Sequence, residues 1–305
     1  MGGNSCRSVV TLTRRAPPPT LPSVAEPLHV TNGDAPVSDI APAAGVRPED
    51  VVPWRDILHD GPVPARLAPG ALARVRAAHL AARGWAAEPD ALRMLMERDA
   101  RLAAHPAEAE VVLWFEDDLY DALQLAQIAD RLAGRPGPVT LARLEHVRPG
   151  DLRPALEERE AYIPATEPFA ALRSPDPRAW AAHTRMDRLL EELPDTRTGL
   201  SRLEREILEA LAAGPLDPHE LFHRVAERER PPWLGDSTVF AVADGLHPLV
   251  TAAAGRRRLT PEGRAVLDGT TTREPHDHWI GGVHLAPDQP HWGWDANARE
   301  AILLD

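Results

Sequence analysis

Apolar and polar positions alternate in blocks along the first half of the chain. The run EVVLWF, residues 110–115, is almost continuously apolar, which is typical of a strand that is buried on both faces of a parallel sheet. Shorter apolar runs predict three more strands, at 28–30, 50–54 and 138–144. Helical patterns separate the later strands, so the order predicts an α/β fold with a small Rossmann-like parallel sheet.

The helices of this part are predicted from apolar positions three and four residues apart. Such stripes occur at 71–84, 88–105 and 122–134. We also expect a short helix broken by Pro42, a loop over 55–70 and a helix over 178–193. Together these elements place an α/β domain at residues 28–195.

A second pattern begins at Ser201, which forms a potential capping box with Glu204. Two further helix starts follow at Asp217 and Asp236, then two short strands around Gly255 and a closing helix. Three helices and a hairpin predict a winged-helix-like domain at 201–269. Residues 270–305 show no clear periodicity, and we expect them to form a tail that packs on the α/β domain.

Composition and charge restrict the function classes. The chain has 305 residues, and all of its 34 basic residues are arginine, which excludes a Schiff-base lysine and a P-loop lysine. The net charge of −12 argues against binding nucleic acid. No apolar run approaches the length of a membrane span. The single cysteine, Cys6, lies in residues 1–27, which we expect to be a disordered leader, and a reducing cytoplasm fits best.

Polar residues follow three of the predicted strands, where a parallel sheet binds its ligands. Asn32 and Asp34 follow the first strand, which contains His29. The second strand leads into Arg55, Asp56 and His59, and the third into Asp118, Asp121 and Gln124. If the three strands are neighbours, these residues form one site. The alternative is that Asp34 or Asp118 caps a helix and that Arg55 pairs with Glu116.

We assign roles to these residues as a hypothesis. Asp56 and His59 would be an acid/base pair, with Asp34 as a third catalytic residue. The expected substrate-binding residues are His29, Asn32, Arg55, Asp118, Asp121, Gln124 and His284, with the planar fork of Arg55 holding an anionic group. No cofactor is expected, because the nucleotide fingerprint G-x-G-x-x-G is absent. A divalent metal at His276 and His278 with a nearby carboxylate is an alternative without a recognised ligand spacing.

Several short motifs together resemble the bacterial domain-of-unknown-function 1835 family. They are LHVTNGD, VVPWRDILHDGPVP and WFEDDLYDALQLAQI, followed by WLGDSTVF and WIGGVHL…WGWD. The resemblance implies that the family's signature positions are occupied by His29, Asn32, Gly33, Asp34, Trp54, Arg55, Asp56, His59, Gly61, Pro62, Asp118, Asp121, Gln124, Gly281, Gly282, His284, Trp294 and Asp295. The chain departs from the family pattern at Ala35 and Pro36, where a small hydroxyl residue is usual, and at Gly293, where arginine is frequent.

The family carries no assigned activity, so the function is inferred from the residues. We expect an enzyme that acts on a small polar or anionic metabolite by acid/base chemistry, as a hydrolase or a transferase. The alternative is a ligand-sensing transcriptional regulator or an adaptor that uses the winged-helix-like domain. The sequence does not fix the oligomeric state.

Overall fold

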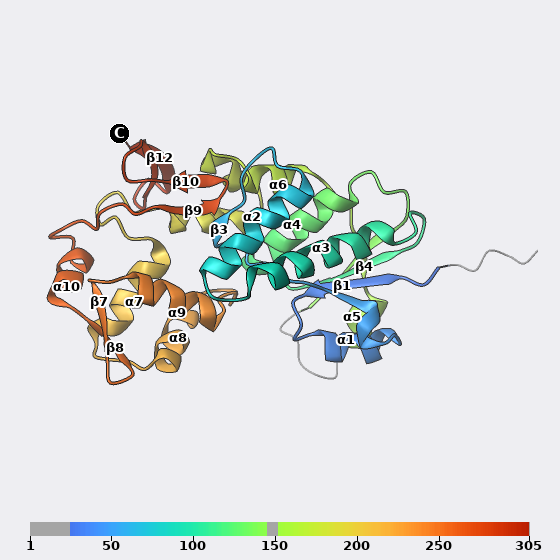
Figure 1. Ribbon diagram of the computed structural model, residues 1–305, viewed down its shortest axis with the longest axis horizontal. Coiled ribbons are helices and arrows are strands. Elements are labelled where there is room, and N and C mark those ends of the chain that lie inside the picture. Colours follow the sequence, from blue (N-terminus) through green and yellow to red (C-terminus); the bar gives the residue numbers. More distant parts are fainter. Residues whose placement is uncertain (1–24, 145–151, 305) are drawn as a thin grey trace, which may run out of the picture.

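The computed structural model of the chain describes residues 25–144 and 152–304 (Figure 1). Residues 1–24 of the predicted leader therefore lie outside the described residues. The first half contains strands and helices in the order β1 Leu28–Asn32, α1 Val37–Ala44, η1 Pro48–Asp50, β2 Val51–Trp54, β3 Gly61–Pro62, α2 Pro69–Ala82, α3 Glu88–Ala104, β4 Val111–Phe115, α4 Leu119–Leu132 and β5 Val139–Arg143.

The second half begins with short elements and continues with helices and hairpins. Its order is α5 Leu152–Glu157, β6 Glu160–Ala161, α6 Glu167–Leu172, η2 Pro177–Ala182, η3 Met186–Glu192, α7 Arg202–Ala212, α8 Pro218–Ala226, α9 Asp236–Gly245, β7 Val250–Ala253, β8 Arg256–Leu259, α10 Pro261–Leu267, β9 His278–Gly281, β10 Val283–Leu285, β11 His291–Asp295 and β12 Glu300–Leu304.

The five-stranded sheet has the order β2-β1-β4-β5-β6. Strands β2, β1, β4 and β5 are parallel, and only the short edge strand β6 is antiparallel. The predicted α/β fold with a parallel sheet is confirmed. The three strands that precede the polar clusters are direct neighbours, so their carboxyl ends lie at one edge.

Helices cover both faces of this sheet (Figure 1). Val111 and Leu113 of β4 point to the face covered by α3 and α4, where they pack with Leu102 and Ile128. The alternate residues of the sheet strands point to the other face and pack against α1 and α5. The run EVVLWF is apolar at every position because β4 is buried on both sides.

Two predicted helices differ from those observed. The segment 178–193 is not one helix but two 3₁₀ segments, η2 and η3, because Arg185 between them has a left-handed backbone with φ 70°. Pro42 does not break α1, which runs on to Ala44. Proline at this position removes one backbone donor, and a helix of only two turns tolerates that loss near its end.

The tail is more ordered than its composition suggested. Strand β9 pairs in parallel with β3, within the segment expected to be a loop, and β10 completes that small sheet. Strands β11 and β12 form a separate antiparallel hairpin. These strands have three to five residues each, and β9 and β11 are rich in glycine, histidine and tryptophan, so no long alternation of apolar and polar positions marked them.

Helices α7, α8, α9 and α10 and the hairpin β7–β8 pack around a core that also includes residues of α4, α6 and η3. The capping box predicted at Ser201 is formed, and Asp217, predicted as a helix cap, forms a second one with Glu220. No helix within residues 25–144 and 152–304 has the length and apolar character needed to cross a membrane.

Candidate functional site

The three polar strand ends contact one another at the carboxyl edge of the sheet. Asn32 donates a hydrogen bond to the carboxylate of Asp121. Arg55 Nε donates to Asp34 Oδ2 over 2.7 Å. Gln124 Nε2 donates to the backbone carbonyl of Asp56 over 2.9 Å. The convergence expected from neighbouring strands is present, but these contacts bind the loops to each other.

Asp56 is buried at this edge of the sheet. Its carboxylate accepts hydrogen bonds from Arg76 Nε and Nη2 at 3.0 and 2.8 Å, and Arg98 Nη2 lies 3.6 Å away. Burial would raise the pKa of Asp56, but the charges of Arg76 and Arg98 lower it. His59 contacts a different residue, since its Nε2 lies 3.4 Å from Thr238 Oγ1. The expected hydrogen bond between Asp56 and His59 is therefore not made, because two arginines occupy the carboxylate.

The other predicted residues of this edge also make internal contacts. Asp118 caps α4, accepting from the amide of Asp121, and burial raises the pKa of Asp118 to about 6. Burial and the charge of Asp118 raise the pKa of Asp121 to about 8. His29 is buried in β1, where Nδ1 accepts from Trp114 Nε1 over 3.0 Å, and burial lowers its pKa. The exposed Arg55 pairs with Asp34 rather than with Glu116.

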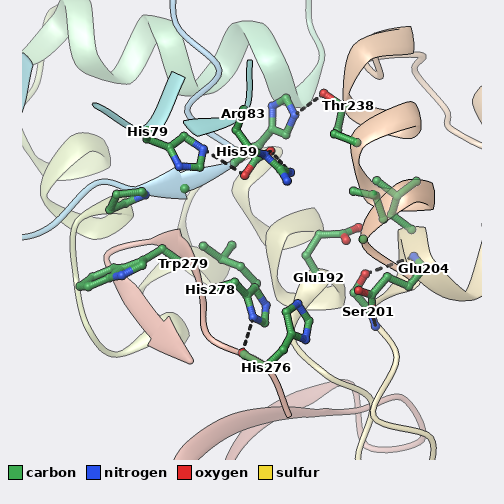
Figure 2. Close-up of a pocket in the computed structure, with 18 of the residues that line it drawn as sticks. His59, His79, Arg83, Glu192, Ser201, Glu204, Thr238, His276, His278 and Trp279 are labelled. Carbon is green, nitrogen blue, oxygen red and sulfur yellow. Dashed lines mark hydrogen bonds and ion pairs between the residues drawn. The ribbon is translucent and has the colours of Figure 1, made fainter. Parts of the chain in front are cut away.

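A cavity of about 390 Å³ lies beside this edge, between the β2–β3 loop, α2, α7, α9 and the approach to β9. Of the predicted acid/base and substrate-binding residues only His59 lines it, together with His276 and His278 of the metal alternative. The titratable residues around it come from distant parts of the chain, and they are His59, Asp60, His79, Arg83, Glu192, Glu204, Arg273, His276, Asp277 and His278. Figure 2 shows His59, His79 and Arg83 on one side and His276 and His278 on the other.

Asp60 is paired with two residues of α2 at one wall of the cavity. His79 Nε2 lies 3.3 Å from Asp60 Oδ1, and Arg83 Nε donates to Asp60 Oδ2 over 2.9 Å. Burial alone would raise the pKa of Asp60, but His79 and Arg83 outweigh it and hold the pKa well below its usual range. A carboxylate this close to an imidazole can orient the ring.

Gly61 makes this arrangement of His79 sterically feasible. Its backbone has φ +83°, and a Cβ built there would lie 2.3 Å from His79 Nε2. The imidazole therefore occupies the volume that any larger residue would fill. Two features favour glycine at position 61, namely the left-handed backbone and the close approach of the His79 ring.

The pKa values of the three other imidazoles of the cavity are lowered. Burial lowers the pKa of His59 to about 4, and its ring packs edge-on against Trp233 with 4.8 Å between centroids. Burial, with the charges of His278 and Arg273, lowers the pKa of His276 to about 4. The rings of His276 and His278 stack 4.1 Å apart, and His278 Nδ1 donates to the carbonyl of His276 over 2.9 Å.

His284 does not line the cavity but contacts two residues that do. Its Nε2 lies 2.8 Å from Asp277 Oδ1, and its ring stacks on Trp279 with 4.5 Å between centroids. The metal alternative has no assembled ligand set, since no three His, Cys, Asp or Glu residues of the described chain are placed to hold an ion.

No protein-family model, curated protein or solved structure matches the chain. The chemistry therefore rests on the residues themselves. The cavity brings together an imidazole that lies 3.3 Å from a carboxylate, three further imidazoles and two paired guanidinium groups. Such a set can bind a small polar molecule and transfer protons to and from it.

The sequence reasoning missed Asp60, His79 and Arg83, although a signal was present. His79 and Arg83 are four residues apart on the predicted helix at 71–84, so they share one face. Asp60 and Gly61 stand directly after His59 in the motif WRDILHDGP. Asp60, the carboxylate that contacts this helix, is the residue after His59, the last candidate predicted in this loop.

Proposed function

We propose that the protein is an enzyme that acts on a small polar metabolite by general acid/base chemistry, as a hydrolase or a transferase. One observation carries the proposal, namely that His79 and its ionised partner Asp60 line a cavity of about 390 Å³. The volume lies within the range of small-molecule sites. The acid/base pair of the proposal is thus Asp60 and His79 instead of Asp56 and His59.

His79 would accept a proton from the substrate or from an attacking water, while Asp60 keeps the ring oriented and Arg83 keeps Asp60 ionised. The distance of 3.3 Å between His79 and Asp60 is longer than an aligned hydrogen bond. Catalytic hydrogen bonds are often long before a substrate is bound. His59, His276 and His278 have lowered pKa values, and a neutral imidazole can accept a hydrogen bond from the substrate. The proposal invokes no cofactor or metal.

We also propose that the chain is related to the domain-of-unknown-function 1835 family. What supports this is that residues of its three N-terminal motifs contact each other, as in the pairs Asn32–Asp121 and Arg55–Asp34. Motifs that are far apart in the sequence thus act as one structural unit at the sheet edge.

A second candidate function is a ligand-sensing regulator or adaptor. It is favoured by α7 and α9, which form part of the cavity wall and belong to the segment that we propose to be winged-helix-like. A bound ligand would hold these helices against the α/β domain. We do not expect this segment to bind nucleic acid, because Arg256 pairs with Glu220, Arg257 pairs with Asp244, and α9 contains no arginine.

The variant His79→Gln tests the enzyme. Purified wild-type protein and variant are incubated with a metabolite extract, and the compounds consumed are identified by mass spectrometry. We expect the wild type to consume at least one compound about 10²-fold faster than the variant, which is the usual contribution of a general base. His223→Gln, an exposed histidine on α8, is the matched control and should behave as the wild type.

Two outcomes contradict the proposal. If His79→Gln consumes the same compound at the wild-type rate, His79 is not the base. If the wild type consumes nothing but retains a small molecule that co-purifies with it, the ligand-sensing function is supported instead.

A further inference from the structure

The charges around the cavity indicate which class of substrate it binds. Four carboxylates line it, those of Asp60, Glu192, Glu204 and Asp277, against two guanidinium groups. Both guanidinium groups are already paired, Arg83 with Asp60 and Arg273 with Glu204. An anionic substrate would thus have to displace a carboxylate of the protein. This argues against the anionic metabolite that the sequence suggested.

Two of the carboxylates retain an oxygen for a ligand. Glu192 Oε1 accepts from Arg188 Nη1 over 2.6 Å, and nothing in the described chain donates to Oε2. Asp277 Oδ1 is bound by His284, and Oδ2 likewise has no donor among the described residues. Figure 2 shows Glu192 at a level between His59 and His276, with its carboxylate on the side of Thr238 and Ser201.

A separate observation also indicates a donor on the ligand. His59 is only 8% exposed, and its Nδ1 has no hydrogen-bond partner within the described residues. Its other nitrogen contacts the hydroxyl of Thr238. When Nε2 donates to that hydroxyl, Nδ1 carries a lone pair that a ligand N–H would satisfy. A buried nitrogen without a partner is costly, and a bound donor removes this cost.

The walls between these polar groups are aromatic. Trp233, Trp279 and the stacked rings of His276 and His278 line the cavity, which is open to solvent at His276 and Asp277. Aromatic faces attract organic cations, and the attraction grows when water is excluded. From the charges, the free carboxylate oxygens and these walls, we propose that the substrate is a small organic cation that carries an amidinium, guanidinium or amine group, held by Glu192 and Asp277. The inference rests on the cavity of the proposed function and specifies its ligand.

Three probes of the same size and different charge test this inference. Benzamidine is positive, benzamide is neutral and benzoate is negative at neutral pH. We expect benzamidine to bind more tightly than benzamide, and benzoate to show no binding, in ligand-observed NMR titrations. The ring signals of His276 and His278 should shift on binding, which places the probe in the cavity.

Glu192→Gln removes the charge but keeps an oxygen that can accept from Arg188. We expect it to lower the affinity for benzamidine about tenfold, the effect of losing one charge-assisted hydrogen bond. Affinity for benzamide should not change, which also shows that the variant is folded. The matched control is Glu191→Gln, because the neighbouring Glu191 pairs with Arg202 and does not line the cavity.

Equal affinities for the three probes, preferential binding of benzoate or no binding of any probe would overturn the inference. So would an unchanged affinity of Glu192→Gln for benzamidine. These results are independent of the His79→Gln experiment. A protein that consumes a metabolite through His79 but rejects benzamidine retains the proposed function and loses only the cationic substrate.

Discussion

At the scale of single residues, the carboxylate of Asp56 is fully buried between two guanidinium groups. The side chains of Asp56 and Arg76 are 0% and 1% exposed, and Arg98 also donates to the carbonyl of Arg55 and to Gln127. A buried charge of this kind contributes stability only while its partners remain. Asp56 therefore connects the loop after β2 to α2 and α3, and we expect its removal to lower the free energy of unfolding.

We predict that Asp56→Ala lowers the free energy of unfolding by about 3–5 kcal/mol, because it leaves the buried guanidinium group of Arg76 without a carboxylate and leaves Arg98 with Asp99 alone. Urea denaturation followed by circular dichroism measures the change. Asp90→Asn is the control, since Asp90 pairs with Arg93 on the exposed face of α3 and should unfold as the wild type does. A near-wild-type Asp56→Ala would show that the pair contributes little.

The sequence placed Asp56 correctly at a strand end but assigned it the wrong partner. Proximity in the chain made His59 the candidate, whereas the structure gives Arg76, 20 residues away. Arg76 was hidden because arginine is abundant and normally lies on the surface of a helix. Only the packing of α2 against the loop shows that this arginine faces inward, and that packing has no signature in a single sequence.

At the scale of elements, long periodic segments were predictable and short irregular ones were not. Strand β4 and helices α2, α3 and α4 follow from runs and stripes of apolar residues that need no tertiary information. Strand β3 has two residues and exists because β9 pairs with it from the far end of the chain. The turn at Gly61 leads into β3 and supports His79, so this short element positions the proposed base.

We predict that Gly61→Ala displaces the His79 ring, because the new Cβ would lie 2.3 Å from Nε2 and the backbone φ of +83° is unfavourable for alanine. NMR spectra of the histidine rings should show a shifted His79 signal, and metabolite consumption should fall as in His79→Gln. Gly70→Ala is the control, because Gly70 is on α2, the helix that carries His79, and a Cβ at this position would meet nothing within 4 Å. An unmoved His79 signal in Gly61→Ala would contradict the positioning role.

At the scale of the whole molecule, the proposed site lies where the α/β domain meets the C-terminal half. Its residues come from the β2–β3 loop and α2, from η3 to α9, and from the approach to β9. The sheet edge could be predicted, because strand order brings its residues together. The cavity could not, because its position depends on how the β2–β3 loop and α2 pack against α7 and α9. Of the residues predicted at the sheet edge, only His59 lines the cavity.

The stability of the fold should decrease at acidic pH because of His59, which packs at this junction against Tyr120, Trp233 and Thr238. Burial is the main reason that its pKa falls from 6.5 to about 4, with Arg76, Arg83 and Arg188 also lowering the pKa and Asp60 raising it. Between these two values the unfolded chain binds a proton that the folded chain does not. The contribution of His59 to the free energy of unfolding is thus complete above about pH 6.5 and is lost as the pH falls towards 4.

We predict that His59→Gln reduces the loss of stability between pH 7.5 and pH 4 by about 3 kcal/mol relative to the wild type, from a shift of about 2.5 pKa units. Comparing the two proteins at each pH separates His59 from Asp118 and Asp121, whose raised pKa values have the opposite effect on stability as the pH rises. Urea denaturation across this range measures the difference. Parallel pH profiles for the two proteins would mean that His59 is protonated equally in the folded and unfolded chains, and that the junction does not exclude water from its ring.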